Sequence, residues 1–326
     1  MTLRQSRSPH RLARSWRLLP LLCASTQFAV AQPFVQGAPL AQYLVPRAVT
    51  EIAVDGRLDE FSWELAPQID DFERILNKYD GVAHATRARM LWDDEHLYFG
   101  FACQDPDIWA IFDQEDDEMW SEEVVEVFID PDGDARNYLE LEVNPLNAWV
   151  DLRIIELQPK WVSSKDWDIR GLKTAVQVYG TVNDTSDVDL GWTCEIAIPW
   201  TAMEDSIDGG SRPRPGDQWR LNLYRIERTA GRAAREQLVA DMRRARPLYD
   251  RLRSVLARAG VESPEDVDVQ KYPESAEVMS DIELLQKEIK PRSDAYDEAT
   301  EYTTWSETFE RGFHHPARFG IVQFGE

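Results

Sequence analysis

The sequence has few cysteines, few histidines and too few basic residues to balance its acidic ones. Its 326 residues include three Cys and five His, and 36 Lys and Arg stand against 59 Asp and Glu, for a formal net charge of -23. Nucleic acids and anionic membrane surfaces repel such a polyanion, so neither is expected as a partner. The sequence also lacks G-x-S-x-G, H-E-x-x-H, C-x-x-C and a glycine-rich phosphate loop, so the enzyme classes that these motifs mark are not indicated.

Long apolar runs are also scarce. The run Leu18 to Val30 follows five Arg with no acidic residue, and it ends in Ala29-Val30-Ala31. This arrangement is typical of a secretory signal peptide over residues 1–31, and the run is too short to cross a bilayer. Leu22 precedes Cys23 where a lipidation motif has a small residue, so lipidation is not favoured. We expect an exported protein, periplasmic or extracellular, with no membrane insertion.

After this leader, the cysteines are either joined in a disulfide or buried as free thiols. Only Cys103 and Cys194 remain, each within a strand-like run. An oxidising compartment would allow them to form a disulfide, while two buried thiols on separate strands are the favoured interpretation.

Most of the remaining sequence predicts short strands separated by turn signals. Spacing of this kind, with hairpin connections, predicts an all-β fold, an antiparallel β-sandwich. Residues 59–66 predict one short helix with Asp59 as its N-cap. The expected strands are 86–92, 96–103, 122–130, 137–144, 148–155, 172–179, 191–198, 218–228 and 319–324.

A helical insertion is expected at 229–300, before the last strand. Residues 232–259 have apolar side chains near helical spacing and stop at Gly260, and residues 280–290 predict a second helix stopped by Pro291. The arginine-rich first half is interpreted as a solvated amphipathic face in preference to an RNA or membrane contact. A protein partner through this insertion stays open.

Three carboxylates at alternate positions, Asp130, Asp132 and Asp134, suit an oxygen-rich calcium loop. Leu141 stands where an EF-hand would need its last acidic ligand, so an EF-hand is excluded. A polar hairpin turn is the alternative for this segment.

Tryptophan is abundant, with 12 residues in the chain. Most are expected in the core, but Trp120 lies in the acidic stretch DQEDDEMWSEE, which points to one face near solvent. A flat ring stacks on the C–H face of a sugar, while carboxylates and amides accept hydrogen bonds from the hydroxyl groups of the sugar. The combination of Trp120 and acidic neighbours therefore favours sugar binding.

Seven motifs, in order along the chain, resemble the carbohydrate-binding modules of family 9 and their stand-alone relatives. The resemblance covers about 50–228 and 301–326, and it assigns 45–228 to a family-9-like sandwich and 301–326 to a terminal strand that completes it. The motifs are VDGRLDE with Trp63, LWDDEHLY from Leu91, WSEEVVEVFID from Trp120, NY and EVNP from Asn137, GWTCEIAIPW from Gly191, GDQWRLN from Gly216, and FHHPARFG from Phe313.

This resemblance implies a β-sandwich with bound calcium and a sugar clamped between two aromatic rings. Trp120 matches one ring and Phe313 the other, with Trp305 as an alternative second ring. Glu126 and Asn144 match polar sugar ligands, and Glu142 stands where the characterised modules have Arg.

The expected function is that of a secreted, non-catalytic carbohydrate-binding protein, accessory to xylan or cellulose breakdown. One alternative is a haem-binding electron-transfer domain, although no haem is expected. Others are a glycoside hydrolase and an interaction module that has lost its sugar site. The haem alternative would draw its ligands from Met90, Met119, His84, His96, His314 and His315.

Overall fold

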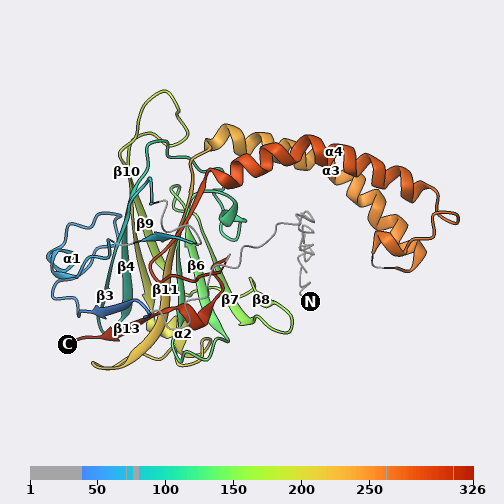
Figure 1. The fold of residues 1–326 in the computed structure, drawn as a ribbon. Coiled ribbons are helices and arrows are strands. Elements are labelled where there is room, and N and C mark those ends of the chain that lie inside the picture. The colour runs from blue at the N-terminus through green and yellow to red at the C-terminus, as the bar shows by residue number, and fades with distance from the viewer. Residues whose placement is uncertain (1–38, 71, 76–80, 262, 311) are drawn as a thin grey trace, which may run out of the picture. The chain divides into compact units, whose positions relative to one another are not determined.

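Two β-sheets packed face to face and a pair of long helices make up the described part of the chain (Figure 1). The computed structural model describes residues 39–70, 72–75, 81–261, 263–310 and 312–326. The signal peptide predicted for residues 1–31 lies outside the described residues. Residues 39–326 form one of the two units into which the chain divides.

The larger sheet has nine strands, ordered β1-β13-β11-β5-β6-β7-β8, with β12 pairing with β11 and β2 pairing with β12. The strands are β1 (Gln42–Val45), β2 (Glu73–Arg74), β5 (Val124–Asp130), β6 (Tyr138–Val143), β7 (Trp149–Glu156), β8 (Val162–Ser164), β11 (Gln218–Arg228), β12 (Thr300–Thr304) and β13 (Gly320–Phe324).

The smaller sheet has four strands in the order β3-β4-β10-β9, all antiparallel. They are β3 (Thr86–Trp92), β4 (His96–Gln104), β9 (Lys173–Tyr179) and β10 (Gly191–Pro199). Each of these strands lies within one residue of a run predicted from the sequence, because alternation and turn residues mark their ends clearly.

The fold is a β-sandwich, but two parts of the predicted class are wrong. The sheets are not all antiparallel, because β1 runs parallel to β13, with Gln42 opposite Ile321. The chain is also not all-β, because α3 (Gly231–Ala259) and α4 (Glu274–Glu298) are long helices. They lie between β11 and β12, so the segment after the helices contributes two strands to the larger sheet.

Strand alternation gives the larger sheet two different buried faces. Val125, Val127 and Ile129 of β5 point into the core between the sheets, with Trp192 and other residues of the smaller sheet. Val124 and Phe128 point the other way, into a second apolar cluster on the outer face of the larger sheet. Because side chains alternate along a strand, Glu126 and Asp130 share this outer face.

Short helices cap the sandwich elsewhere. Helix α1 (Phe61–Leu65) packs Trp63 against Leu91 and Tyr98 of the smaller sheet, and α2 (Trp200–Glu204) follows β10. The prediction of Asp59 as N-cap is wrong. Glu60 occupies that position. Its carboxylate accepts a hydrogen bond from the Ala53 N–H at 2.9 Å and makes no capping hydrogen bond to the helix.

Helices α3 and α4 pack together through Leu252, Val278 and Ile282. Gly260 ends α3 in the left-handed region at φ 71°, as predicted. The prediction that Pro291 stops the second helix is wrong, because α4 continues to Glu298. Contacts beyond the proline offset its cost of about 3 kcal/mol, since Tyr296 is buried and its hydroxyl donates to the Ser121 carbonyl.

Cys103 and Cys194 are free and buried in the core between the sheets. Burial raises the pKa of the Cys103 thiol to about 12, so this thiol is protonated and unreactive at neutral pH.

Candidate functional site

Three carboxylates meet on the outer face of the larger sheet. Glu126 of β5 lies directly opposite Glu142 of β6, and Glu140 shares their face because it precedes Glu142 by two residues. Each side chain offers an oxygen within 4.8 Å of the other two. Glu126 and Glu142 are each 1% exposed and Glu140 is 6% exposed. We call these three residues the carboxylate triad.

Burial dominates the electrostatics of the carboxylate triad. It raises the pKa of Glu140 to about 8, while its hydrogen bond to Glu142 and the charge of Lys165 lower it. Burial, with the charges of Glu126 and Glu140, raises the pKa of Glu142 well above its usual value. Burial and the charge of Glu140 do the same for Glu126, against the opposing charge of Arg228. The triad therefore holds protons at neutral pH, because three like charges cannot ionise together in an apolar setting.

Two oxygens of the triad lack a hydrogen-bond partner. They are Oε1 of Glu126 and Oε2 of Glu142, and both are fully shielded from solvent. A buried polar atom without a partner costs about 1–3 kcal/mol, so these two oxygens favour any donor or cation that reaches them.

Aromatic rings surround the triad. Phe128 of β5 and Tyr224 of β11 lie in the same apolar cluster, and Phe313 stacks on Tyr224 with ring centroids 4.1 Å apart. Nδ1 of His314 and the hydroxyl of Tyr138 share a hydrogen bond of 2.7 Å. Nε2 of the same imidazole lies 3.7 Å from Glu140 Oε2. Burial lowers the pKa of His314 to about 4, so its imidazole is neutral at pH 7.

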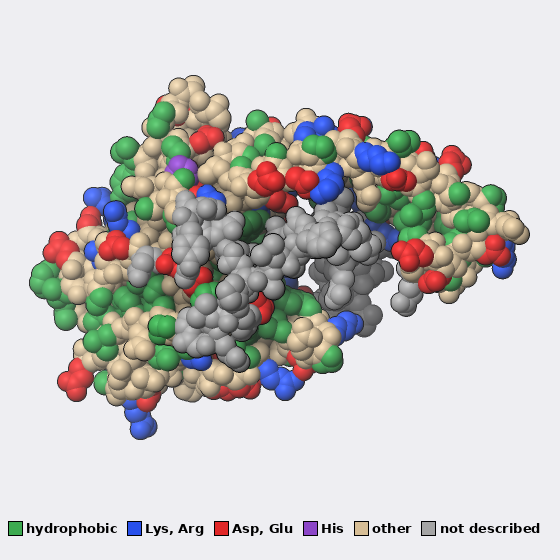
Figure 2. All heavy atoms as spheres, viewed as in Figure 1, with side chains coloured by type: hydrophobic (Ala, Val, Ile, Leu, Met, Phe, Trp, Pro, Cys, Tyr) green, Lys and Arg blue, Asp and Glu red, His purple; other side chains and the backbone are tan. Residues whose placement is uncertain are grey.

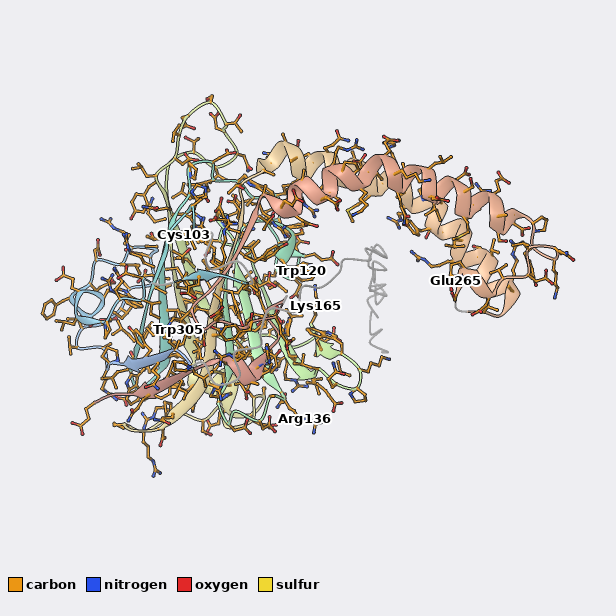
Figure 3. The ribbon with its side chains drawn as sticks, viewed as in Figure 1. Cys103, Trp120, Arg136, Lys165, Glu265 and Trp305 are labelled. Atoms are coloured by element: carbon orange, nitrogen blue, oxygen red, sulfur yellow. The ribbon has the colours of Figure 1, made fainter. Side chains whose placement is uncertain are left out.

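Trp120 lies at the edge of this face, on the short η2 helix (Met119–Ser121) directly before β5. Its side chain is 37% exposed, as the acidic surroundings in the sequence predicted. The ammonium of Lys165 lies 4.5 Å from the centre of its ring, and Figure 3 shows the two residues next to each other. The site thus offers a partly open indole beside a cation and a buried acidic group.

The helical insertion holds the η2 helix in place. Arg235 of α3 donates to the Ser121 hydroxyl at 2.8 Å, and Tyr296 of α4 donates to the Ser121 carbonyl. Arg228, at the end of β11, donates to the Trp120 carbonyl at 2.8 Å. These contacts fix the backbone that carries Trp120, so the insertion contributes directly to the shape of the candidate site.

Four of the six predicted sugar-binding residues, Trp120, Glu126, Glu142 and Phe313, gather on this face, but the two others have different surroundings. Trp305 is wrong as a second ring, because it packs edge-on against Tyr43 in the core between the sheets. Asn144 is fully buried, and its amide donates to the Phe112 carbonyl and to Glu122. Its oxygen accepts from two backbone N–H groups of the following turn, so this side chain shapes the loop between β6 and β7.

Several residues of the site were not predicted. Glu140 could have been found from its spacing, since it precedes Glu142 by two positions in a strand. Trp161 directly precedes the short strand β8 and Lys165 directly follows it. Both lie far from the motifs, and no local pattern marks them. Trp161 is 40% exposed and packs its ring edge against His314 with centroids 4.4 Å apart, so it is a second partly open indole on this face.

The predicted calcium loop follows β5 at the end of the same strand. Asp130, Asp132 and Asp134 each offer an oxygen within 4.8 Å of the others, which fits an oxygen-ligated cation. Burial, with the charges of Asp132 and Asp134, raises the pKa of Asp130 to about 6. The Asp130 carboxylate accepts hydrogen bonds from the Gly133 and Ala135 N–H groups, which shape the loop. The residues present would hold calcium through these three carboxylates.

The haem-ligand candidates do not form one group. Met90 lies in the core between the sheets, whereas Met119 lies in the cluster on the outer face of the larger sheet.

The long helices carry a groove of about 830 Å³ that is rich in arginine. Figure 2 shows acidic and basic side chains mixed over this pair of helices. Arg244 and Glu288 form one ion pair between α3 and α4, and Arg258 and Glu274 form another. The arginine-rich face of α3 is thus matched in part by its acidic partner helix. Among the described residues, no helix is long and apolar enough to cross a membrane.

Comparison with known proteins agrees with the resemblance inferred from the motifs. The family model described as carbohydrate family 9 binding domain-like matches residues 54–212. A protein of Bacteroides uniformis, described as a candidate carbohydrate-binding protein, superposes with a TM-score of 0.53 at 13% identity. The alignment covers 87% of this chain and 99% of that one, which shows a shared fold.

Two structures of a family 9 carbohydrate-binding module from Caldicellulosiruptor kristjanssonii also match, each with a TM-score of 0.45 and 13% identity. One is a complex with cellotriose, and its alignment covers 87% of this chain and 93% of the module. The other is a complex with glucose, and its alignment covers 87% of this chain and 96% of the module. No match was found among curated proteins.

Proposed function

The chain carries a carbohydrate family 9 binding-like domain over residues 54–212, and from this we propose that it binds carbohydrate on the outer face of its larger sheet. The observation that carries the proposal is the partly exposed ring of Trp120 at the edge of a face that also holds the carboxylate triad. A sugar stacks its C–H face on such a ring, and its hydroxyl groups donate hydrogen bonds to carboxylates. The family model over residues 54–212 supports the proposal.

The backbone that carries the Trp120 ring is fixed by contacts within the free protein. Arg228 and the two helices fix the η2 backbone, so little conformational freedom is lost when a ligand binds. Lys165 covers part of the Trp120 ring in the free protein, so a ligand must share or displace this contact.

We further propose the finer role suggested by the sequence. The protein is exported, acts without covalent chemistry as an accessory to xylan or cellulose breakdown, and holds calcium at Asp130, Asp132 and Asp134. Calcium there would offset two of the three negative charges and stiffen the turn after β5, the strand that carries Glu126.

The test is a tryptophan-fluorescence titration of the full chain with xylo- and cello-oligosaccharides, each native and borohydride-reduced. We expect saturable quenching and at least tenfold weaker binding for Trp120→Ala, because stacking is lost. Phe61→Ala is the matched control, since Phe61 is 55% exposed on α1, which covers the smaller sheet. Equal affinities of Trp120→Ala and Phe61→Ala would refute binding at Trp120.

Reduced sugars separate two modes of binding at this site. Loss of binding on reduction indicates recognition of the reducing end of the chain, and retained binding indicates recognition along it. Repeating the titration with a chelator tests whether calcium supports the site.

A further inference from the structure

The carboxylate triad and the imidazole beside it form a compact set of metal donor atoms. Glu126, Glu140 and Glu142 each place an oxygen within 4.8 Å of the other two. Nε2 of His314 lies 3.7 Å from Glu140 Oε2. Two donor atoms bound to one zinc ion at about 2.0–2.2 Å lie at most about 4.4 Å apart. Small side-chain rotations therefore suffice to bring these donors onto a single ion.

Two oxygens of the triad have no partner in the protein. Glu126 Oε1 and Glu142 Oε2 are shielded from solvent and accept no hydrogen bond, and each residue is 1% exposed. The two residues lie directly opposite each other on β5 and β6, so both side chains extend from the same face of the sheet into the triad. Among the residues that the structure describes, no lysine or arginine forms an ion pair with the triad. These oxygens thus lack the positive partner that a buried carboxylate normally has.

The imidazole of His314 is oriented like a metal ligand. Its hydrogen bond to the Tyr138 hydroxyl uses Nδ1, which leaves Nε2 on the side of Glu140. Metal-bound histidines have this arrangement, in which a hydrogen bond at the other ring nitrogen fixes the ring. Burial lowers the pKa of His314 to about 4, so a proton does not compete with a metal ion for this ring at neutral pH.

His314 also lies between the buried triad and the surface. Its side chain is 27% exposed, and the partly open ring of Trp161 packs edge-on against it. A metal ion does not need a pocket of the size that a sugar needs, because structural metal sites close around the ion. Movement of this partly exposed imidazole would give an ion a path to the triad.

The mixture of ligands indicates the class of metal. Calcium and magnesium prefer ligand sets made of oxygen alone, whereas imidazole suits zinc and its transition-metal neighbours. We propose that the carboxylate triad and His314 bind one divalent transition-metal ion of the zinc type. The ion would tie the terminal segment that carries His314 to β5 and β6. This inference goes beyond carbohydrate binding and does not depend on it, since the Trp120 ring is not a ligand.

The test is a calorimetric titration of the full chain with zinc chloride, after removal of metals with a chelator and dialysis. Calcium is kept at about 2 mM throughout, so that the loop at Asp130, Asp132 and Asp134 does not take up zinc. We expect one zinc ion per chain with a Kd of about 1 µM or lower near about pH 7.5, and magnesium binding at least about 100-fold more weakly. Absence of stoichiometric zinc binding, or magnesium binding as tight as that of zinc, would overturn the inference.

Variants locate the ion. Glu142→Gln and His314→Gln should each weaken zinc binding by about 100-fold or more, because each removes a ligand. Gln resembles the protonated acid of the metal-free triad, so Glu142→Gln should fold. The controls are Glu283→Gln, which removes a carboxylate that is 67% exposed on α4, and His84→Gln, which removes a histidine beside the smaller sheet. Equal zinc affinities of all four variants would mean adventitious binding to the surface and would refute the site.

Proton release gives a second readout. Zinc binds ionised carboxylates, and burial raises the pKa values of the triad, so its carboxyl groups hold protons in the metal-free protein. Zinc should therefore release more than about one proton per ion, measured by titration in two buffers of different ionisation enthalpy. Surface carboxylates are already ionised and would release almost none, so zinc binding without proton release would contradict the inference.

The two proposals fail separately, because the zinc titrations contain no sugar. Quenching by oligosaccharides in a protein that binds no zinc removes the metal site and leaves carbohydrate binding intact. Stoichiometric zinc binding that depends on Glu142 and His314, without a response to any oligosaccharide, leaves the metal site and removes the proposed function.

Discussion

Replacing Glu140 by Gln should stabilise the protein at pH 8 and change its stability little at pH 5. Burial raises the pKa of this carboxyl from 4.5 to about 8. A carboxyl with a raised pKa in the fold contributes its full stability below its unfolded pKa and loses it as pH rises toward the folded value. Wild-type protein therefore loses stability from this group between about pH 4.5 and pH 8.

The magnitude follows from the size of the pKa change. A tenfold change in proton affinity is worth about 1.4 kcal/mol, so the loss from Glu140 reaches about 4 kcal/mol at pH 8 and stays below about 1 kcal/mol at pH 5. Gln has the shape of the protonated acid and carries no charge, so it avoids this loss.

Urea unfolding at pH 5, 6.5 and 8 and constant ionic strength measures the effect as a difference between variant and wild type. The difference is needed because burial also raises the pKa of Glu227 to about 8 and that of Glu195 to about 7, and both remain in the variant. Glu283→Gln serves as the surface control. Equal destabilisation of Glu140→Gln at all three pH values would show that Glu140 is ionised in the fold and would refute the reasoning.

Three further outcomes are expected. Gly191→Ala should destabilise the fold by about 3 kcal/mol or more in urea unfolding, since φ is +135° and a Cβ would lie 2.0 Å from the Cys103 carbonyl oxygen. Millimolar calcium should raise the melting temperature of wild type but not of the double variant Asp132→Asn, Asp134→Asn, and equal shifts would place calcium elsewhere. Pro291→Ala should stabilise the protein by about 1 kcal/mol or more in urea, because it removes a proline from the interior of α4, and a loss of stability would contradict this.

The strands of the sandwich could be predicted well because most have strong local signals. β3 and β11 begin and end where alternation and turn residues placed them. β1 was missed because its four residues carry no strong alternation, and it forms only by parallel pairing with β13 at the other end of the chain. Such pairing depends on tertiary contacts that no short window contains.

The boundary between the insertion and the last strands was predicted less well. Pro291 has the local signature of a helix stop, but Arg292 pairs with the buried Asp241 of α3 at 2.8 Å and holds the helix together across it. β12 then begins directly after α4, at Thr300. Tertiary contacts outweigh the local preference of the proline at this point.

Half of the candidate site followed from sequence motifs and half from the fold. Trp120 was found from its acidic neighbours and from the family resemblance, and Glu126 and Glu142 were found from the resemblance alone. Lys165 reaches the site from a loop 45 positions beyond Trp120, and only the folded chain shows that contact. Trp305 was misplaced because its segment pairs with β11 and turns the ring inward.

The central claim is that the outer face of the larger sheet binds carbohydrate through Trp120. The most direct measurement is the fluorescence titration of wild type, Trp120→Ala and Phe61→Ala with cello- and xylo-oligosaccharides. The account predicts saturable quenching in wild type and Phe61→Ala, and at least tenfold weaker binding in Trp120→Ala. Absence of a response to both sugar series in folded wild-type protein would contradict it.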